Sequence, residues 1–300
     1  MTEPKKQRKA KVGIIGTGNI GSDLLVKIMR SDFLECTLFA GQNPNSEGIK
    51  RAKSMGINTS SESIKAVQDD PSLCEIVFDA TSAKAHAIHA PILKALGIYT
   101  IDMTPSNIGK MCIPIINLEE GIEVKNVNMI TCGGQATTPI INTIMKIHPE
   151  IEYVEIVSSV SSLSAGIGTR NNIDEYTQTT SDGIMRLTGV KKAKTIIILN
   201  PADPPIYMHN TIYASVENPN MDLIKKNIAD TVEKIQRYVP GYKLIGEPIY
   251  ANGLLTVMLE VVGLGDFLPK YAGNLDIINC AAIAVAEKYA KKKLIFKNQK

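Results

Sequence analysis

The chain of 300 residues is 44% hydrophobic and 21% charged, with a formal net charge of +3, which is typical of a globular protein of one or two domains. Its excess lysines gather near both ends, which favours solvated tails over a nucleic-acid surface. No apolar run approaches the roughly 20 residues of a membrane helix, and no secretion signal opens the chain. Five scattered cysteines and four histidines, without paired spacings, argue against a zinc site and favour thiols in a reducing cytoplasm.

The first motif is a glycine-rich turn that follows a predicted disordered tail over residues 1–10. A buried strand over residues 11–15 runs directly into Gly16-Thr17-Gly18-Asn19-Ile20-Gly21, and a helical pattern follows. In a dinucleotide-binding turn the first glycine permits the tight bend, the second admits a pyrophosphate and the third lets the helix pack on the strand. The phosphates rest on the helix N-terminus. The strand before and the helix after the motif therefore predict a Rossmann domain.

The residues after the second strand bear on the cofactor. This strand covers residues 36–40, and Gln42 and Asn43 follow where an NAD-binding fold usually has a carboxylate for the ribose. Lys50 and Arg51 come shortly afterwards. The amides can bind a ribose hydroxyl, while the missing carboxylate would tolerate the extra phosphate of NADP. The sequence thus predicts NAD and does not exclude NADP.

Strands and helices continue to alternate up to residue 101. We predict a helix over 61–69, a strand over 74–80, a helix over 84–96 and a strand over 98–101, which together imply a parallel sheet with both faces covered. Ligands bind at the carboxyl ends of such strands, where Thr81, Ser82, Asp102 and Thr104 fall. Asp102 is either a site residue or a loop cap. His86 and His89 are expected on the helix surface.

Cys132 stands out because of its position between a predicted strand and a predicted helix. An apolar run ends at Thr131, and Gly133 and Gly134 follow the cysteine. Helix N-termini present unpaired N–H groups with partial positive charge, which would lower the pKa of the thiol and could hold an oxyanion. The two glycines would leave room for a substrate. We therefore interpret Cys132 as a catalytic nucleophile, with Gln135 either orienting substrate or bonded structurally.

The second half of the chain has a different pattern. A strand over 151–160 leads into a serine-rich loop and Arg170, which suit contact with a polar or anionic ligand. Strands over 195–199, 211–216 and 254–262 and helices over 173–187 and 221–237 indicate a mixed sheet in an α+β domain. A last helix extends from 273 to about 292. We expect a disordered tail (1–10), a Rossmann domain (11–131), a catalytic and dimerisation domain (132–272), and a C-terminal helix (273–300) packing back on the Rossmann domain.

Five motifs in this order closely resemble the CoA-acylating acetaldehyde dehydrogenases, the partners of 4-hydroxy-2-oxovalerate aldolases in aromatic meta-cleavage pathways. The resemblance covers residues 11 to 290. The motifs are Gly16-Thr17-Gly18-Asn19-Ile20-Gly21, Thr131-Cys132-Gly133-Gly134-Gln135-Ala136-Thr137, Ser164-Ala165-Gly166-Ile167-Gly168-Thr169-Arg170, Asn200-Pro201-Ala202-Asp203-Pro204-Pro205 and Tyr271-Ala272-Gly273-Asn274-Leu275-Asp276-Ile277.

The resemblance implies oxidation of acetaldehyde or propanal with NAD and coenzyme A, through a thioester on Cys132. It also implies a homodimer, an aldolase partner and passage of the aldehyde between the two active sites. The cofactor residues that it implies are Gly16, Thr17, Gly18, Asn19, Ile20, Gly21, Ser164, Ala165, Gly166, Ile167, Gly168, Thr169, Arg170, Asn171, Asn172 and Asn274. No metal is expected.

The chain departs from the family pattern at three places. Asn43 replaces an Asp of many relatives, and His209-Asn210-Thr211 replaces Arg-Asp-Thr, whose Asp lies near the reacting cysteine. The general base is therefore unassigned, with His209 as one candidate. The segment between Gly246 and Leu254 is also shorter than in several relatives, which bears on the aldolase interface.

Two other functions fit the same residues. An enzyme of this architecture could use phosphate or water as the acyl acceptor, as semialdehyde and phosphorylating dehydrogenases do. A phosphate-dependent enzyme would need paired basic residues near the cysteine, for which Arg170 and Arg186 are the candidates. Alternatively, the chain could be a nucleotide-binding scaffold without catalysis, in which case Cys132 would be unreactive.

Overall fold

The computed structural model describes residues 8–166, 169–170 and 172–295. The chain divides into two compact units. The first comprises residues 1–110, 119–128 and 282–300, and the second comprises residues 111–118 and 129–281. Within the described residues, no helix combines the length and the apolar character needed to span a bilayer.

The first unit is built on a parallel sheet, as the alternation of strands and helices predicts. Its strand order is β3-β2-β1-β4-β5-β7-β6, and β1 pairs in parallel with both β2 and β4. The core strands are buried along almost their whole length, as expected of a sheet covered on both faces. The strands are β1 (Ala10–Ile15), β2 (Leu34–Ala40), β3 (Thr59–Ser60), β4 (Ile76–Asp79), β5 (Tyr99–Asp102), β6 (Lys110–Met111) and β7 (Asn126–Asn128).

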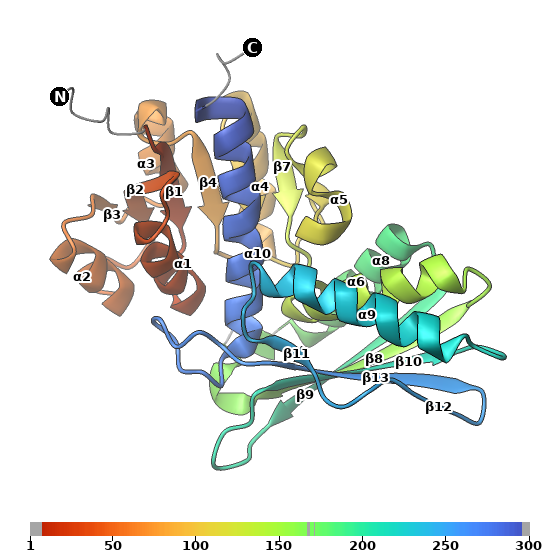
Figure 1. The fold of residues 1–300 in the computed structure, drawn as a ribbon. Coiled ribbons are helices and arrows are strands. Elements are labelled where there is room, and N and C mark those ends of the chain that lie inside the picture. Colours follow the sequence, from red (N-terminus) through yellow and green to blue (C-terminus); the bar gives the residue numbers. More distant parts are fainter. Residues whose placement is uncertain (1–7, 167–168, 171, 296–300) are drawn as a thin grey trace, which may run out of the picture. The chain divides into compact units, whose positions relative to one another are not determined.

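Helices connect these strands (Figure 1). The N-cap residues of three of them are Gly18 before α1, Ser46 before α2 and Ser82 before α4. The two serines accept a backbone N–H in the first turn, whereas no side chain caps α1. The helices are α1 (Asn19–Met29), α2 (Glu47–Ser54), α3 (Ile64–Asp69), α4 (Ala83–Ala95) and α5 (Pro114–Gly121).

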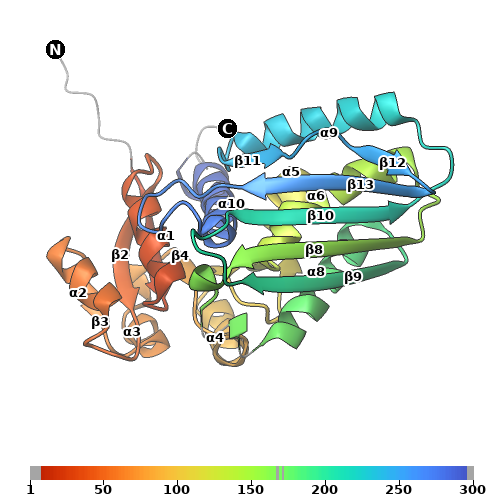
Figure 2. The same cartoon turned by 90° about the horizontal axis from the view of Figure 1, so that it is seen from below.

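The second unit contains a mixed sheet with helices on one face (Figures 1 and 2). Its strand order is β11-β13-β10-β8-β9, with β12 added to β13; β8 and β9 are parallel, whereas β10 runs antiparallel to β8 and β13. The strands are β8 (Tyr153–Ser161), β9 (Lys192–Asn200), β10 (Met208–Ser215), β11 (Tyr242–Leu244), β12 (Ile249–Ala251) and β13 (Leu254–Val261). The helices are α6 (Cys132–Ile147), α8 (Ile173–Thr188), α9 (Met221–Gln236) and α10 (Gly273–Tyr289).

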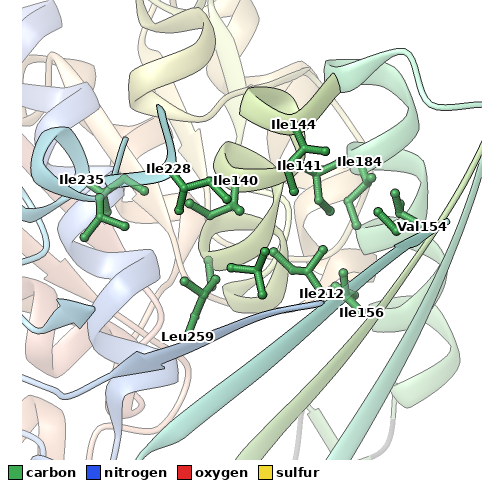
Figure 3. Close-up of a cluster of buried hydrophobic side chains, with 14 of the residues drawn as sticks. Ile140, Ile141, Ile144, Val154, Ile156, Ile184, Ile212, Ile228, Ile235 and Leu259 are labelled. Carbon is green, nitrogen blue, oxygen red and sulfur yellow. The ribbon is translucent and has the colours of Figure 1, made fainter. Parts of the chain in front are cut away.

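One apolar cluster holds the second unit together (Figure 3). Strands β8, β10 and β13 alternate buried and half-exposed residues, so one row of side chains faces the helices. Isoleucines from α6, α8 and α9 meet this row. Fully buried members include Ile140, Ile156, Ile184, Ile212, Ile228 and Leu259. Because this core fixes α6 against the sheet, it also fixes the residue that begins α6, Cys132.

Helix α10 is divided between the units, since residues up to 281 belong to the second and residues from 282 belong to the first. In the first unit, Tyr289 stacks on Tyr99 with ring centroids 3.7 Å apart, and Glu287 accepts a hydrogen bond of 2.6 Å from Ser31. A π-helical segment over Ala290–Ile295 follows α10. Most of the predicted tail lies outside the described residues, and Ala10 is already the first residue of β1.

The fold class predicted from the sequence is confirmed, as are its principal helices and strands. Helices α2 and α5 and the short strands β3, β6, β11 and β12 were not predicted, because they are too brief to show periodicity. The boundary predicted before Cys132 was wrong. The strand before Cys132 ends at Asn128, and Ile130 adopts a left-handed backbone with φ of 62°, which breaks the strand.

Candidate active site

Cys132 is the first residue of α6, and its backbone position is tightly determined. Thr131 is the N-cap, and its hydroxyl accepts the Gly134 N–H at 3.0 Å. Ile130, one residue earlier, is buried in its strained conformation, where a β-branched residue is costly. A Cβ atom on Gly134 or on Gly183 of α8 would lie 2.8 Å from Ile130. These glycines therefore make room for Ile130, which sets the approach of the chain to Cys132.

Tyr176 of α8 was not predicted to belong to the site, yet its hydroxyl lies against the nucleophile. Its Oη is 3.5 Å from the Cys132 Sγ and accepts the Gly133 N–H at 3.0 Å. A Cβ atom on Gly133 would lie 2.4 Å from this oxygen. The interpretation that Gly133 and Gly134 make room for substrate is therefore wrong for this state of the protein. Gly133 admits the tyrosine hydroxyl, and Gly134 admits Ile130.

The pKa of the Cys132 thiol is raised, not lowered as the helix N-terminus suggested. Burial disfavours the thiolate and is the largest cause, while hydrogen bonds from Tyr176 and from the Gly133 N–H partly offset it. The pKa of Tyr176 is raised well above its usual value by burial and by the neighbouring sulfur, so its hydroxyl keeps its proton. Cys132 nevertheless remains partly exposed to solvent. Its ionisation thus depends on what donates to the sulfur.

Other expected groups near Cys132 have structural partners. The Gly133 N–H, expected to hold an oxyanion, donates to Tyr176. Gln135 is buried, and its Nε2 donates to the carbonyls of Cys112 and Met129 at 2.8 and 2.9 Å, which favours the structural alternative. His209 pairs with Glu260 at 2.9 Å.

Behind the tyrosine lies a buried polar pair in the same unit. Asn210 of β10 is 1% exposed, and its Oδ1 accepts a hydrogen bond of 2.7 Å from Ser158 of β8. Ser158 also lies beside Tyr176, since its Oγ and the Tyr176 Oη are 3.1 and 2.4 Å from the position that a Cβ atom on Gly133 would take. Neighbouring residues of a strand face opposite sides of the sheet. Asn210 is on the face of Ser158 and Tyr176, so His209 is on the other face. His209 is therefore no acid or base for Cys132 here.

The glycine-rich turn has the geometry expected of a phosphate-binding loop. Gly16 has φ of 113°, and a Cβ atom there would lie 2.4 Å from the Ala80 carbonyl oxygen. A Cβ atom on Gly21 would lie 1.9 Å from the Gly16 carbonyl oxygen, because helix and strand are closely packed. At Gly18, by contrast, a Cβ atom meets nothing within 4 Å. Open space and an uncapped helix start at this one glycine fit a pyrophosphate.

The expected ribose region follows β2. Gln42 and Asn43 are exposed, and the Asn43 Oδ1 accepts the Asn45 N–H at 3.0 Å. Lys50 forms an ion pair of 2.7 Å with Glu47. Both partners of this ion pair are exposed, so the pair is weak and leaves Lys50 available to a ligand phosphate.

The serine-rich loop and Asn274 come together in the second unit. Arg170 bends back onto its own loop and donates to the carbonyls of Ala165 and Ser162 and to the Ser162 hydroxyl, at 3.0, 2.6 and 2.8 Å. Asn274 is buried and donates to the Ser164 carbonyl at 3.5 Å, while its Oδ1 has no partner among the described residues. Ile167, Gly168 and Asn171 lie outside the described residues.

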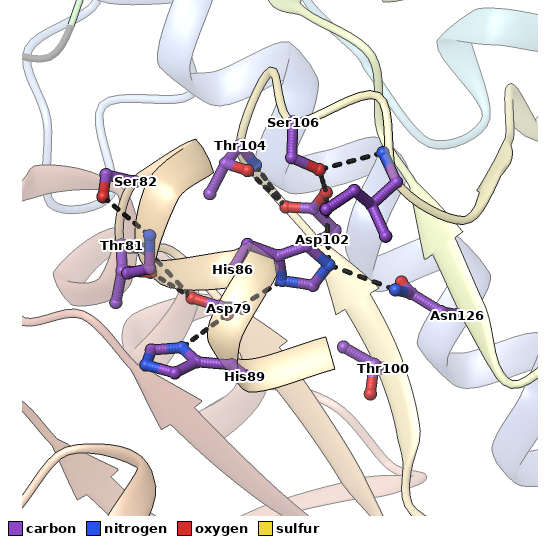
Figure 4. Close-up of polar contacts among 12 residues, drawn as sticks. Asp79, Thr81, Ser82, His86, His89, Thr100, Asp102, Thr104, Ser106 and Asn126 are labelled. Carbon is purple, nitrogen blue, oxygen red and sulfur yellow. Dashed lines mark hydrogen bonds and ion pairs between the residues drawn. The ribbon is translucent and has the colours of Figure 1, made fainter. Parts of the chain in front are cut away.

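His86 and His89 are not on the surface of α4, contrary to expectation. Both are buried and direct Nδ1 at the same Asp79 oxygen, at 2.9 and 2.8 Å (Figure 4). The pKa of Asp79 is lowered: burial alone would raise it, but the hydrogen bonds from the two histidines outweigh burial. The pKa of His86 is raised by Asp79 and Asp102 against the opposite effect of burial.

Asp102 proves to be a loop cap. It accepts the Thr104 N–H at 2.8 Å and also hydrogen-bonds the hydroxyls of Thr104 and Ser106. Burial raises its pKa. Thr81 and Ser82 have similar local partners, Asp79 and the N–H of Ala85. The polar residues at these strand ends therefore stabilise the loops, and among the described residues no cluster is arranged to hold a metal ion.

Two family models match the chain, one in each half. Residues 11–115 match a model described as semialdehyde dehydrogenase, NAD binding domain, and residues 132–269 match prokaryotic acetaldehyde dehydrogenase, dimerisation. An acetaldehyde dehydrogenase of Pectobacterium atrosepticum is 52% identical over 282 residues, covering 93% of this chain and 95% of the relative. One of Geobacillus stearothermophilus is 52% identical over 288 residues, covering 95% and 98%. The chain belongs to the acetaldehyde dehydrogenase family. The resemblance seen in the five motifs is thereby confirmed.

Solved structures extend this family relationship to the fold. An aspartate semialdehyde dehydrogenase II of Vibrio cholerae aligns with a TM-score of 0.67 at 12% identity, covering 96% of this chain and all of the other. An aspartate semialdehyde dehydrogenase of Candida albicans, solved with NADP, gives the same score at 11% identity. At these identities the likeness concerns the fold that acetaldehyde dehydrogenases share with semialdehyde dehydrogenases.

Proposed function

We propose that this protein oxidises acetaldehyde with NAD and coenzyme A to acetyl-CoA, through a thioester on Cys132. The single observation that supports this most is a partly exposed cysteine at the start of α6, in a chain that is half identical to acetaldehyde dehydrogenases over nearly its whole length. Cys36 and Cys74 are poor alternatives, because burial raises the pKa of each thiol to about 12. Propanal is the next aldehyde to test.

The chemistry proceeds at the sulfur of Cys132. Its thiolate attacks the aldehyde carbonyl carbon, which gives a thiohemiacetal on the protein. The carbonyl oxygen becomes an alkoxide, and loss of a hydride from the same carbon leaves a thioester. The sulfur of coenzyme A then attacks the thioester carbonyl, its thiol proton passes to water, and the Cys132 thiolate is the leaving group. Covalent capture thus separates oxidation from acyl transfer.

For the dinucleotide, we propose the glycine-rich turn together with Ser164, Ala165, Gly166, Ile167, Gly168, Thr169, Arg170, Asn171, Asn172 and Asn274. When bound, NAD supplies the nicotinamide ring that accepts the hydride. The residues fit this group: Gly18 offers open space at an uncapped helix start, and the buried Asn274 Oδ1 has no partner among the described residues. A carboxamide N–H is a suitable donor for that oxygen. NADP is the second cofactor to test.

We further propose that the homodimer implied by the dimerisation model forms through the open face of the second sheet. On the face away from α6, α8 and α9, the register aligns Met258, Thr211, Val157 and Ile196 in one row across four strands. Most of this row is apolar, which suits burial against a second copy. Light scattering of a Val157→Lys variant tests this, since a charge at the centre of the row would lower the dimer fraction.

An aldolase partner and a reducing, cytoplasmic location remain proposals from the motif resemblance. None of the five cysteines, all of which lie in the described part of the chain, forms a disulfide, which agrees with reducing conditions. Co-purification with a 4-hydroxy-2-oxovalerate aldolase encoded in the same genome tests the complex. A dehydrogenase that elutes alone at high concentration of both proteins would contradict it.

The decisive assay follows NADH absorbance with acetaldehyde and NAD, in the presence of coenzyme A, of phosphate or of neither. We expect NADH formation that depends on coenzyme A and its loss in Cys132→Ser. Cys36→Ser is the matched control, since Cys36 is a half-buried thiol of the first unit, and it should keep the rate. Phosphate-dependent turnover would instead favour a phosphorylating dehydrogenase, and a fully active Cys132→Ser would reject the mechanism.

A further inference from the structure

A row of hydroxyl and amide groups leads from the sulfur of Cys132 into the second unit. Tyr176 contacts the sulfur at 3.5 Å, the Ser158 hydroxyl lies beside Tyr176 at Gly133, and the Ser158 Oγ and the Asn210 amide are 2.7 Å apart. Ser158 has a single hydroxyl proton, so it donates to Tyr176 only with the Asn210 amide turned over, when the Asn210 Nδ2, without a partner among the described residues, donates to Ser158. The row crosses four elements, α6, α8, β8 and β10. Tyr176, Ser158 and Asn210 are all at least nine-tenths buried, so the row is held by packing.

The row ends in an amide, which decides what it can do. An asparagine side chain neither takes up nor releases a proton near neutral pH, so Asn210 cannot act as the base for Cys132. Tyr176 keeps its own proton because burial and the neighbouring sulfur hold its pKa far above neutral. The hydroxyls can therefore orient hydrogen bonds but cannot accept the thiol proton permanently.

Ionisation of Cys132 fixes the direction of the first hydrogen bond. The S–H bond breaks, the electron pair stays on sulfur, and the proton passes to water, which reaches the site because Cys132 is partly exposed. A thiolate has no proton to donate, so the contact at 3.5 Å can persist only if the Tyr176 O–H points to the sulfur. The tyrosine oxygen meanwhile accepts the Gly133 N–H at 3.0 Å, which polarises its O–H bond.

We propose that Tyr176 is a second catalytic residue, which stabilises the Cys132 thiolate by donating its hydroxyl proton in a hydrogen bond, and that Ser158 and Asn210 are positioning residues for that hydroxyl. This inference rests on the proposed function, in which Cys132 is the nucleophile. The same hydrogen bond acts twice in the cycle. It stabilises the attacking thiolate, and it stabilises the same thiolate when coenzyme A displaces it from the thioester.

The causes that shift the pKa of Cys132 include no charged side chain of the described residues. Tyr176 is the titratable side chain that acts on the thiol, and its effect opposes that of burial. The nearby side chains of α8, β8 and β10 are neutral: Thr180 bonds Thr131 at 2.7 Å, and Ser158 bonds Asn210. A change in the pH profile of Cys132 can therefore be assigned to Tyr176.

The test is the rate of Cys132 alkylation by iodoacetamide as a function of pH, with the modified cysteine identified by mass spectrometry. This measurement needs no aldehyde, NAD or coenzyme A. We expect Tyr176→Phe to raise the midpoint of the profile by about one pH unit and to slow alkylation near neutral pH about tenfold, as loss of one hydrogen bond to a charged group implies. An unchanged midpoint, or a lower one, would overturn the proposal.

Two matched controls separate this effect from a loss of packing. Tyr242→Phe removes another fully buried tyrosine hydroxyl, which donates to the Ala136 carbonyl of the same helix at 2.7 Å but does not touch the sulfur. It should leave the alkylation midpoint unchanged. Ser158→Ala should move the midpoint in the same direction as Tyr176→Phe by a smaller amount, whereas Ser159→Ala, on the opposite face of β8, should not. Equal shifts in Ser158→Ala and Ser159→Ala would contradict the positioning role.

The outcomes also distinguish this proposal from the proposed function. If the wild type alkylates at Cys132 with the expected Tyr176 dependence but forms no NADH from acetaldehyde, the proposed function fails and the hydrogen bond stands. If NADH formation is normal but Tyr176→Phe leaves both the alkylation profile and the rate unchanged, only the role of Tyr176 fails.

Discussion

A side chain on Gly133 would collide with the hydroxyl of Tyr176, because a Cβ atom there would lie 2.4 Å from the tyrosine oxygen. The two residues come from different helices, so the glycine after the nucleophile is required by tertiary packing. The Ser158 Oγ, at 3.1 Å from the same Cβ position, closes the other side. These two oxygens therefore leave no room for a Cβ atom at position 133.

This relationship predicts the outcome of a double-mutant cycle. Gly133→Ala should destabilise the protein by about 1–3 kcal/mol, because overpacking forces Tyr176 to move, and it should slow Cys132 alkylation. Adding Tyr176→Phe removes the colliding oxygen, so the double variant should be more stable than Gly133→Ala alone. Thermal melting of the four proteins measures the coupling. Additive effects would mean that the alanine is accommodated elsewhere.

The glycine-rich turn predicts different results for two alanine variants. Gly18→Ala should fold with an unchanged melting temperature, since its Cβ meets nothing within 4 Å, but it should bind NAD more weakly because the backbone must approach the pyrophosphate. Gly21→Ala should lower the melting temperature, since its Cβ would lie 1.9 Å from the Gly16 carbonyl oxygen. Calorimetry and NAD titration separate the two effects. Normal NAD affinity in Gly18→Ala would place the phosphates elsewhere.

Asn274 provides a test of the nicotinamide site that is independent of Cys132. Asn274→Ala removes the buried Oδ1 that has no partner among the described residues, and it should raise the dissociation constant for NAD several-fold, by loss of one hydrogen bond of about 1 kcal/mol. The alkylation profile of Cys132 should not change. Asn279→Ala, at another buried asparagine of α10, is the control and should keep NAD affinity. A comparable loss in both variants would indicate a general effect on the helix.

The cluster around Asp79 predicts a pH-dependent stability. The folded-state pKa of His86 is raised above its unfolded value of about 6.5. The contribution of His86 to the free energy of unfolding is therefore complete below about pH 6.5 and is lost as the pH rises through the folded-state pKa. The pKa of Asp79 is lowered, so Asp79 affects stability at acidic pH. Its contribution to the free energy of unfolding is present above about pH 3.9 and is lost as the pH falls through its folded-state pKa.

His86→Gln should therefore destabilise the protein by about 3 kcal/mol near pH 6 and flatten the pH dependence above it, because it leaves a buried carboxylate short of a charged partner. Melting temperatures between pH 5.5 and 8.5 measure both. The Asn126 side chain is compatible with a protonated His86. Its Nδ2 lies 3.1 Å from the His86 Nε2, and its Oδ1 has no partner among the described residues. Turning the amide over would let the Oδ1 accept the proton of a protonated Nε2. Unchanged stability at pH 6 would contradict the ion pair.

The sequence alone was enough to predict the two-domain architecture, the family and the candidate nucleophile. Those features have local signatures: alternating apolar runs, glycines at fixed spacing, and a cysteine followed by a helical pattern. The tertiary structure was needed for the side chains around the nucleophile. Tyr176 reaches Gly133 across 43 residues of chain, and Ser158 reaches Asn210 across 52, because α8, β8 and β10 share a core with α6.

The same distinction explains the errors. The histidines of α4 were expected on the surface, yet His86 is fully buried while Ile88 of the same helix is 65% exposed. Which face of a helix is buried depends on what packs against it, and here Asp79 at the end of β4 can satisfy two buried imidazoles. Likewise, a helix N-terminus alone suggests a lowered cysteine pKa. Burial reverses that shift at Cys132, because the cost of desolvating a thiolate is set by packing rather than by neighbours in sequence.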